Sequence, residues 1–390
     1  MILIGKPYVS DFLIKTIKKN KFQIVATAEA KELISDESLN WVSEAAAKKI
    51  IKSEPNHLIY SNSENTISWV EANLSETKRP EQIKHFKNKI AFRELLKDVY
   101  PNYFFKGVKY EDLDTFSVNN LKFPFIIKPA IGFFSLGVHK VDEPAEWNDV
   151  LTKIKTDIEH IKGFYPTEVL NTNNFIIEEC IEGEEYAIDC YYNNKGEAVI
   201  LNCMHHVFSS GKDVSDRVYS TSKEIITSTL KPVQNLVNII GEKTGLKNFP
   251  IHIEVRIDSN GTIIPIEVNP MRFGGWCTTG DVANYAFGIN SYEYFIYNKK
   301  PNWNAIFKQK EDKKCSLILL DNNSGIEQND IASFDYDKLL ADFENPLLLR
   351  KITIGEYPIF GFLFTETSKG NEGELKTILT SNLRKYIVKK

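Results

Sequence analysis

The chain has 390 residues, 42% of them hydrophobic and 26% charged, which are ordinary values for a soluble globular protein. Its net charge of −4 gives no broad basic surface, so we expect no nucleic acid partner. No stretch approaches the ~18 apolar residues of a membrane span, and the apolar run after Met1 is too short for a signal peptide. The five cysteines form no C-x-x-C pair, which argues against a zinc site, and we expect a cytoplasmic protein.

Apolar runs alternate with amphipathic segments over the first 80 residues. We expect, in chain order, a strand at 2–5, a helix at 10–19, a strand at 23–28, a helix at 39–52, a strand at 57–60 and a helix at 66–74. Strands that alternate with helices predict a parallel sheet with crossover helices. No G-x-G-x-x-G follows the first strand, so the dinucleotide fingerprint is absent. The pattern predicts a small Rossmann-like domain that ends in a linker over 77–80.

The rest of the chain begins with a helix and then becomes rich in strands. A helix is expected over 81–97, with Ile83, Phe86 and Ile90 on one face. Further strands are expected at 123–128, 175–181, 186–192, 198–203 and 359–365, and further helices at 229–244, 292–298 and 372–383. This mixture predicts an α/β (α+β) fold. Residues 301–390 carry no interpretable motif, and we expect them to complete a substrate pocket, cap a sheet or form a dimer contact.

Two strand-like runs, 251–257 and 263–270, flank the dipeptide Asn260-Gly261. This dipeptide is a strong signal for a two-residue hairpin turn. Since side chains alternate between the faces of a strand, residues that pair across the hairpin share one face. The predicted register pairs Ser259 with Thr262, Glu254 with Glu267 and His252 with Asn269.

Glu254 and Glu267 would then face each other across the hairpin, where like charges destabilise a sheet. A hard cation between them removes the repulsion, and Mg²⁺ prefers one or two carboxylates, oxygen ligands and substrate phosphates. Together with Asn269, the pair predicts a site for Mg²⁺ and a nucleotide. The alternative is that these residues form the solvent-facing side of an antiparallel sheet.

A lysine-containing strand leads into a glycine-containing loop at 128–138. The loop can offer backbone N–H groups and the Ser135 hydroxyl to phosphates, and Lys128 supplies a point charge. It does not match the Walker pattern G-x-x-x-x-G-K-[ST]. The alternative is a simple turn between two strands with an exposed lysine.

An acidic segment spans 177–186, with five carboxylates within eight residues around Gly183. The functional interpretation is a hinge where backbone groups meet a purine edge and a carboxylate accepts hydrogen bonds from ribose. The alternative is a solvated acidic connection between two strands.

The order and spacing of these motifs resemble the ATP-grasp superfamily, and the resemblance covers roughly 80–300. It is carried by Lys89, by Lys128 with its loop, by the acidic segment, and by Glu254 with Glu267-x-Asn269. The resemblance implies a Rossmann-like domain at 1–80, a small ATP-grasp lobe with a connecting helix at 81–185, a large lobe with the metal site at 186–300, and a small C-terminal subdomain at 301–390.

The resemblance also implies a role for each residue that matches a motif. For the phosphates of ATP, it implies that Lys89 and Lys128 hold them and that Ser135 and Gly137 lie in the loop that covers them. For the nucleoside, it implies that Glu178 faces the adenine amino group, that Glu179 and Ile181 contact the base through their backbones, and that Glu185 binds ribose. Phe133 and Phe134 depart from the pattern, because many relatives carry small residues there.

The implied cofactors are ATP and Mg²⁺, with Mn²⁺ as an alternative, and the implied metal ligands are Glu254, Glu267 and Asn269. Arg272 and Lys128 would stabilise the charge that develops during phosphoryl transfer. We expect His252 to orient its neighbours. The substrate candidates are His206, Arg217 and Arg256, of which Arg217 is expected to bind a carboxylate bidentately.

The implied activity is that of a carboxylate–amine ligase of the amino-acid ligase type, which works through an acyl phosphate. The implied partners are a small-molecule carboxylate and an amine, and a homodimer is left open. Three alternatives remain at this point: a carboxylase-type enzyme that activates bicarbonate, an ATP-binding protein without turnover, and an ordinary α/β protein in which the motifs occur by chance.

Overall fold

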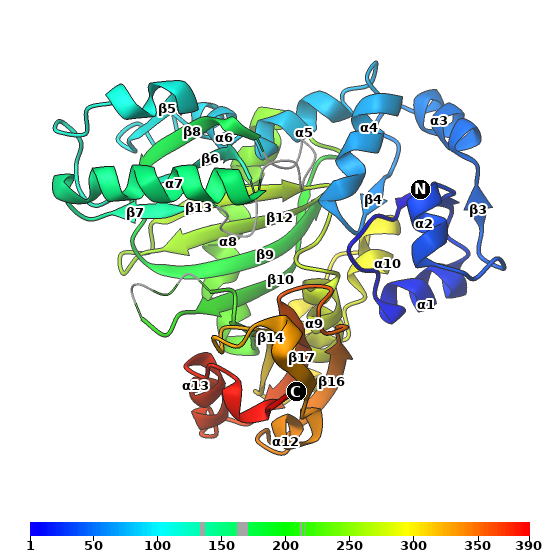
Figure 1. Ribbon diagram of the computed structural model, residues 1–390. Helices are drawn as coiled ribbons and strands as arrows, with labels where there is room; N and C mark the ends of the chain where they lie inside the picture. Colours follow the sequence, from blue (N-terminus) through cyan, green and yellow to red (C-terminus); the bar gives the residue numbers. More distant parts are fainter. Residues whose placement is uncertain (133–136, 162–170, 211–212, 214) are drawn as a thin grey trace.

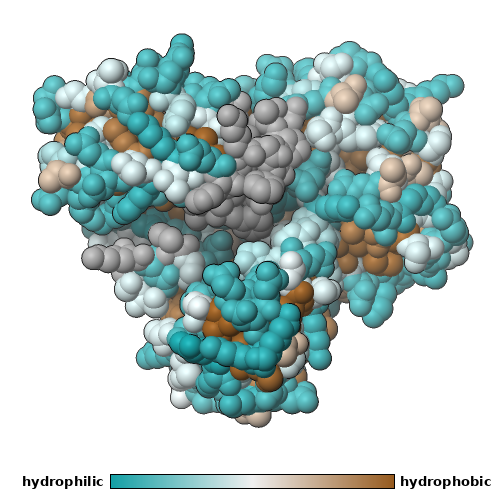
Figure 2. All heavy atoms as spheres, in the orientation of Figure 1, coloured by the Kyte–Doolittle hydropathy of each residue, from teal (hydrophilic) through white to brown (hydrophobic). Residues whose placement is uncertain are grey.

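The computed structural model describes residues 1–132, 137–161, 171–210, 213 and 215–390. Figure 1 shows a small lobe at the upper left, the N-terminal domain at the right and the C-terminal region below. No helix in these described ranges is long and apolar enough to cross a membrane. On the face drawn in Figure 2, hydrophilic residues predominate and the hydrophobic patches are small.

The N-terminal domain is a four-stranded sheet of order β3-β2-β1-β4, which is parallel as predicted and has one strand, β3, more than the pattern predicts. Helix α1 starts where the prediction has it, because the Ser10 side chain accepts a hydrogen bond from the Leu13 N–H. The predicted helix at 39–52 is wrong at its start, because 41–42 pair in the sheet. The elements are β1 (Ile2–Leu3), α1 (Asp11–Asn20), β2 (Ile24–Val25), α2 (Ala28–Leu33), β3 (Trp41–Val42), α3 (Glu44–Ser53), β4 (Tyr60–Ser61) and α4 (Ile67–Asn73).

The connecting segment contains two helices, α5 (Arg79–Lys87) and α6 (Lys89–Leu95), where a single helix over 81–97 was predicted. Asn88 separates them with extended backbone angles, and its side chain accepts hydrogen bonds from the first N–H groups of α6. Pro80 lies in the first turn of α5, where a missing N–H costs nothing, so the predicted linker is in fact the start of a helix.

The small lobe is an antiparallel sheet of order β5-β8-β6-β7, with α7 (Trp147–Ile161) packed across one face (Figure 1). Phe125, Ile127 and Phe175 from the sheet and Trp147 and Ile154 from the helix form its core. The strands are β5 (Phe105–Lys109), β6 (Phe125–Ile131), β7 (His139–Val141) and β8 (Asn171–Glu179).

The large lobe is built on an eight-stranded sheet of order β13-β12-β9-β10-β11-β14-β17-β16, in which neighbouring strands are antiparallel. Helix α8 packs along β10, and α9 packs on β14. The strands are β9 (Glu184–Tyr192), β10 (Ala198–Val207), β11 (Val218–Thr221), β12 (Phe249–Ile257), β13 (Ile263–Pro270), β14 (Lys314–Asp321), β16 (Pro346–Lys351) and β17 (Ile359–Thr367), and the helices are α8 (Lys223–Thr244), α9 (Thr278–Phe287), α10 (Ser291–Ile296) and α11 (Trp303–Gln309).

The C-terminal region at 301–390 is therefore continuous with the large lobe, since β14, β17 and β16 extend the same sheet. Its outer part packs on β11, β14 and β17 in a second core, which includes Phe334, Leu339 and Tyr386. That outer part contains β15 (Ile331–Phe334), α12 (Tyr336–Leu340), α13 (Gly373–Leu379) and β18 (Ile387–Lys389).

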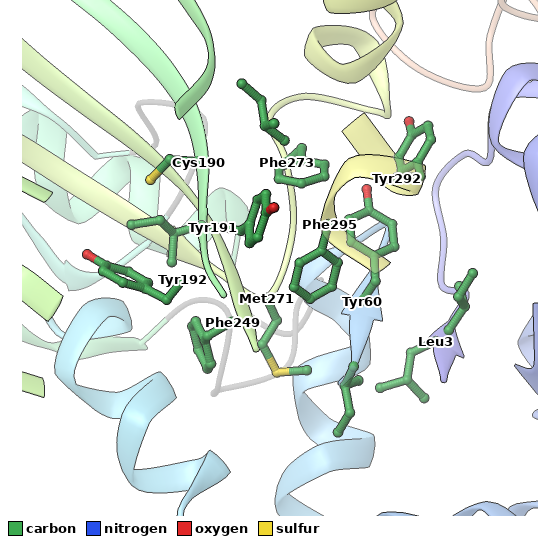
Figure 3. Packing of buried hydrophobic residues seen from close by; sticks show 14 of the residues in the cluster. Leu3, Tyr60, Cys190, Tyr191, Tyr192, Phe249, Met271, Phe273, Tyr292 and Phe295 are labelled. Atoms are coloured by element: carbon green, nitrogen blue, oxygen red, sulfur yellow. The ribbon is translucent and has the colours of Figure 1, made fainter. Parts of the chain in front are cut away.

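An aromatic cluster fixes the N-terminal domain against the large lobe. Tyr60 of β4 packs on Phe273 and Tyr292, with ring centroids 5.4 and 5.3 Å apart, and Phe295 lies beside them (Figure 3). Such aromatic pairs contribute about 1 kcal/mol each beyond the area they bury. The cluster lies next to the end of β13, so the N-terminal domain supports the segment that follows the predicted metal ligands.

Candidate active site

The β12–β13 hairpin places Glu254 directly opposite Glu267 and His252 opposite Asn269, which confirms the predicted register at the site. The predicted turn is wrong. Asp258 pairs with Thr262, so the loop has three residues, and Gly261 takes a φ of 79° in the left-handed region. The longer loop alone would shift the register by one residue.

A β-bulge restores the register before the site. The ladder pairs Val255 with Pro265 and then Glu254 with Glu267, so Ile266 is an extra residue on β13. Two departures from the predicted hairpin therefore cancel. Without the bulge, Glu267 would move to the opposite face from Glu254, because side chains alternate along a strand.

The two facing carboxylates carry different charge environments. Burial and the charge of Glu267 raise the pKa of Glu254, whose only ion-pair partner in the described part of the chain is the His252 imidazole at 3.7 Å. Burial alone would raise the pKa of Glu267 too, but Lys89 and Lys128 outweigh it and lower that pKa to about 2. Glu254 is thus a carboxylate without a lysine or arginine partner in the described part of the chain, and the His252 imidazolium is its nearest cation.

The donor set fits Mg²⁺. The Asn269 amide nitrogen lies 3.4 Å from the Glu267 carboxylate, so the amide is next to the two facing carboxylates. Two carboxylates and an amide oxygen are the hard ligands that Mg²⁺ accepts, with substrate phosphates to complete its octahedron. The described residues contain no group of three or more His, Cys, Asp or Glu that could hold a metal by themselves. Two carboxylates and one amide leave coordination positions that substrate phosphates could fill.

Two buried lysines approach from separate elements. The Lys89 ammonium, at the start of α6, lies 2.9 Å from Glu267 and donates to the Gly132 carbonyl at 3.1 Å. The Lys128 ammonium, on β6, lies 2.6 Å from Glu178. Both predicted phosphate ligands are therefore beside the carboxylate cluster, in ion pairs with its members.

Glu178 lies at the centre of the buried charges. It accepts from the Arg93 guanidinium at 2.7 Å and from Lys128, and these two cations overcome its burial and lower its pKa to about 2. Both carboxylate oxygens are ion-paired, so the contact with an adenine amino group that we predicted for this side chain stays a prediction.

The rest of the acidic segment is held by neighbouring strands. The Glu179 N–H donates to the Phe104 carbonyl, and the Ile181 carbonyl accepts from Arg256 at 2.8 Å. Glu185 lies 2.8 Å from the His206 ring nitrogen and 3.1 Å from Arg256. Glu185, His206 and Arg256 thus lie together on the sheet face that carries Glu254, and Ile181 is next to them through its bond to Arg256.

Arg272 is held by the N-terminal domain. Its guanidinium donates to Glu64 at 3.0 Å, and Glu64 also accepts from Lys87 at 2.5 Å. The charge of Glu267 partly opposes the lowering of the Glu64 pKa, so this triad is close to the predicted metal ligands. Glu64 follows β4 in a 3₁₀ turn, and no motif of the sequence marked it.

Asp189 and Gly274 are further parts of the site that the sequence did not reveal. Asp189 accepts from the Gly274 N–H at 2.9 Å and lies 2.7 Å from His252. Burial alone would lower the pKa of His252, but Asp189 and Glu254 raise it to about 9. Asp189 lies opposite His252 on β9, which is a relationship that only the sheet order creates.

The prediction that Arg217 binds a substrate carboxylate is wrong. Arg217 is almost fully buried, forms an ion pair with Asp321 at 2.5 Å and donates to the Ser381 carbonyl at 2.8 Å. Its guanidinium faces the C-terminal region instead of the sheet face with Glu254. Ser135, Phe133 and Phe134 lie outside the described residues. Gly137 has a φ of 69°, which favours glycine.

Comparisons with known proteins agree with this geometry. The ATP-grasp domain family matches residues 121–280, the segment that holds Lys128, the acidic segment and the β12–β13 hairpin. The chain carries an ATP-grasp domain. No curated protein matches the chain in sequence.

Several solved structures share the fold of this chain. An L-amino acid ligase from Bacillus licheniformis superimposes with a TM-score of 0.68 at 17% identity, over 100% of this chain and 98% of that one. N5-carboxyaminoimidazole synthase from Aspergillus clavatus, in complex with ADP, gives a TM-score of 0.64 at 11% identity, over 97% of each chain. Biotin carboxylase from Campylobacter jejuni gives a TM-score of 0.63 at 13% identity, over 94% of this chain and 87% of that one.

Proposed function

We propose that this chain is an ATP-dependent ligase that joins a small-molecule carboxylate to an amine, and that it releases ADP and phosphate. The observation that carries the proposal is the pair of facing carboxylates, Glu254 and Glu267, with Lys89 and Lys128 converging on the same cluster from α6 and β6. The similarity to an L-amino acid ligase over the full length of the chain supports it.

The reaction has two steps. A carboxylate oxygen of the first substrate attacks the γ-phosphorus of ATP, and the bond to the ADP oxygen breaks, which gives an acyl phosphate. The amine nitrogen of the second substrate then attacks the acyl carbon, phosphate leaves, and the nitrogen loses a proton as the amide forms. No protein nucleophile is needed, so catalysis would rest on positioning and on neutralisation of charge.

The residues of the site divide these tasks. Lys89 and Lys128 would hold phosphate oxygens, and Arg272, which Glu64 and Lys87 position, would neutralise charge on the transferred group. Glu254, Glu267 and Asn269 would hold Mg²⁺, which, when bound, neutralises the phosphates during transfer. Lys89 is paired with Glu267 and would exchange this carboxylate for a phosphate oxygen if Glu267 holds the metal.

The test is phosphate release from Mg-ATP across a pairwise panel of amino acids and small carboxylates. Release that requires both a carboxylate and an amine, with an amide product in the mass spectrum, supports the ligase. Release that requires bicarbonate and no amine would show a carboxylase-type activity instead. Tight ATP binding without ADP formation across the whole panel would show an ATP-binding protein without turnover.

A further inference from the structure

The bulge at Ile266 is the local feature that aligns the two carboxylates in this hairpin. It converts the register of a three-residue loop into the register that sets Glu267 opposite Glu254. A bulge interrupts the hydrogen-bond ladder and leaves backbone groups without partners in the sheet. β13 is also the edge strand of its sheet, so no further strand can supply those partners.

Arg93 supplies the missing partners. From α6 its Nη1 donates to the Pro265 carbonyl at 2.5 Å, and its Nη2 donates to the Ile266 carbonyl at 3.3 Å. These are the two carbonyls of the bulge. Pro265 has no N–H, so the bulge offers mainly acceptors to the outside, and the guanidinium carries only donors.

The same guanidinium also fixes the small lobe. Its Nε donates to Glu178 at 2.7 Å, on the strand that ends in the acidic segment, and its plane lies over the Tyr103 ring at 4.8 Å. Arg93 is buried, so its charge must be matched by these partners. The planar fork of an arginine can make all three contacts at once, whereas a lysine ammonium on a single stem cannot.

We propose that Arg93 is a positioning residue for the metal site, because it holds the Pro265–Ile266 bulge that keeps Glu267 opposite Glu254. The inference rests on the proposed function only in that Glu254 and Glu267 are metal ligands. Arg93 touches neither the substrates nor the metal in this role. Its effect must therefore be on metal binding first and on turnover as a consequence.

The variant that tests the role is Arg93→Lys, which keeps the charge beside Glu178 and loses the fork. The readout is the dissociation constant of Mn²⁺ with a saturating non-hydrolysable ATP analogue, measured by electron paramagnetic resonance. A second readout is ATP binding in EDTA. We expect the Mn²⁺ dissociation constant to rise about tenfold, since charged hydrogen bonds to the bulge are lost, while binding in EDTA changes by less than about twofold.

Two matched controls separate this role from general stability. Arg79→Lys alters another buried arginine. Arg79 lies on α5, away from the bulge, and donates to the carbonyls of His57 and Asn248. Tyr100→Phe removes a hydrogen bond to the Ile263 carbonyl, on the same edge strand but on the loop side of the bulge. Both controls should leave the Mn²⁺ dissociation constant unchanged, even where they lower the melting temperature.

Deletion of Ile266 provides a second route if Arg93→Lys folds poorly. Removal of the extra residue would give a regular ladder with Glu267 still opposite Glu254, so Arg93 would no longer be needed there. Mn²⁺ binding should return when the deletion is combined with Arg93→Lys. The inference is overturned if Arg93→Lys leaves Mn²⁺ binding unchanged, if a control weakens it equally, or if the deletion restores nothing. A wild-type protein that binds no Mn²⁺ would overturn the proposed metal site and this inference with it.

Discussion

The Lys89 ammonium lies 2.9 Å from the Glu267 carboxylate, so a predicted phosphate ligand and a predicted metal ligand neutralise each other. Glu254, directly across the hairpin, has only the His252 imidazolium, at 3.7 Å, as an ion-pair partner in the described part of the chain. In the proposed reaction, binding of Mg-ATP exchanges the partners of Lys89 and Glu267. This exchange makes metal binding and nucleotide binding depend on each other.

Replacement of Glu267 by glutamine should separate metal binding from nucleotide binding. The variant should lose ADP release almost completely, because a metal ligand is gone. It should also bind ATP about tenfold more tightly than the wild type in EDTA, since Lys89 is released for phosphate. Calorimetric titration with ATP in EDTA measures the second effect. Unchanged turnover would remove Glu267 from the metal site, and weaker ATP binding would contradict the exchange.

The His252–Asp189 pair predicts a loss of stability at alkaline pH. The pKa of His252 is raised from 6.5 to about 9, so its contribution is complete below pH 6.5 and is lost as the pH rises through 9. The protonated His252 therefore contributes on the order of 3 kcal/mol to the free energy of unfolding. The free energy of unfolding, measured with urea, should fall less between pH 7 and pH 10 in Asp189→Asn than in the wild type. Equal decreases would show that Asp189 does not stabilise the imidazolium.

Gly274→Ala should damage the site through His252. A Cβ at this position would lie 2.4 Å from the His252 ring and 2.8 Å from Thr279, so the ring would have to move. We expect a destabilisation of about 1–3 kcal/mol. We also expect that a higher Mg²⁺ concentration is needed for half-maximal turnover. Gly373→Ala is the matched control, because no atom lies within 4 Å of its added Cβ. A Gly274→Ala protein with wild-type stability and activity would show that the ring position is not critical.

Arg217→Met should affect stability and not substrate affinity. The substitution leaves Asp321 without its ion-pair partner and removes the contact with the Ser381 carbonyl, which should cost about 3–5 kcal/mol. Chemical denaturation measures the loss. The KM of the carboxylate substrate should stay at its wild-type value in protein that remains folded. A raised KM in a fully stable variant would return Arg217 to the substrate pocket.

The residue types at the site could be predicted because chemistry limits them. Facing carboxylates on a hairpin, a lysine at the end of a strand and an acidic hinge are visible as local patterns, and the structure brings Glu254, Glu267, Lys89 and Lys128 together. The parallel N-terminal sheet also followed from alternating patterns. The turn of the hairpin was predicted wrongly, because Asn-Gly also suits a three-residue loop with Gly261 in the left-handed region.

The residues that support the site could not be predicted, because they act from distant segments. Arg93 and Glu178 are separated by 85 positions, and Arg272 and Glu64 by 208. Arg217 was assigned to the substrate from its charge and neighbourhood, whereas its direction depends on the C-terminal region that packs against it. No local pattern contains the sheet order that brings such residues into contact.

The placement of β14 next to β11 sets a limit on how the chain can be shortened. β11 is a four-residue strand whose outer backbone groups all pair with β14, at Val218–Ile318 through Thr221–Cys315. A chain cut at residue 300 would keep every candidate ATP and metal residue but would expose this strand as a bare edge. Such an edge pairs readily with other chains. We would therefore expect the shortened protein to self-associate through β11, so that insolubility, rather than any defect in its chemistry, would be the first thing observed.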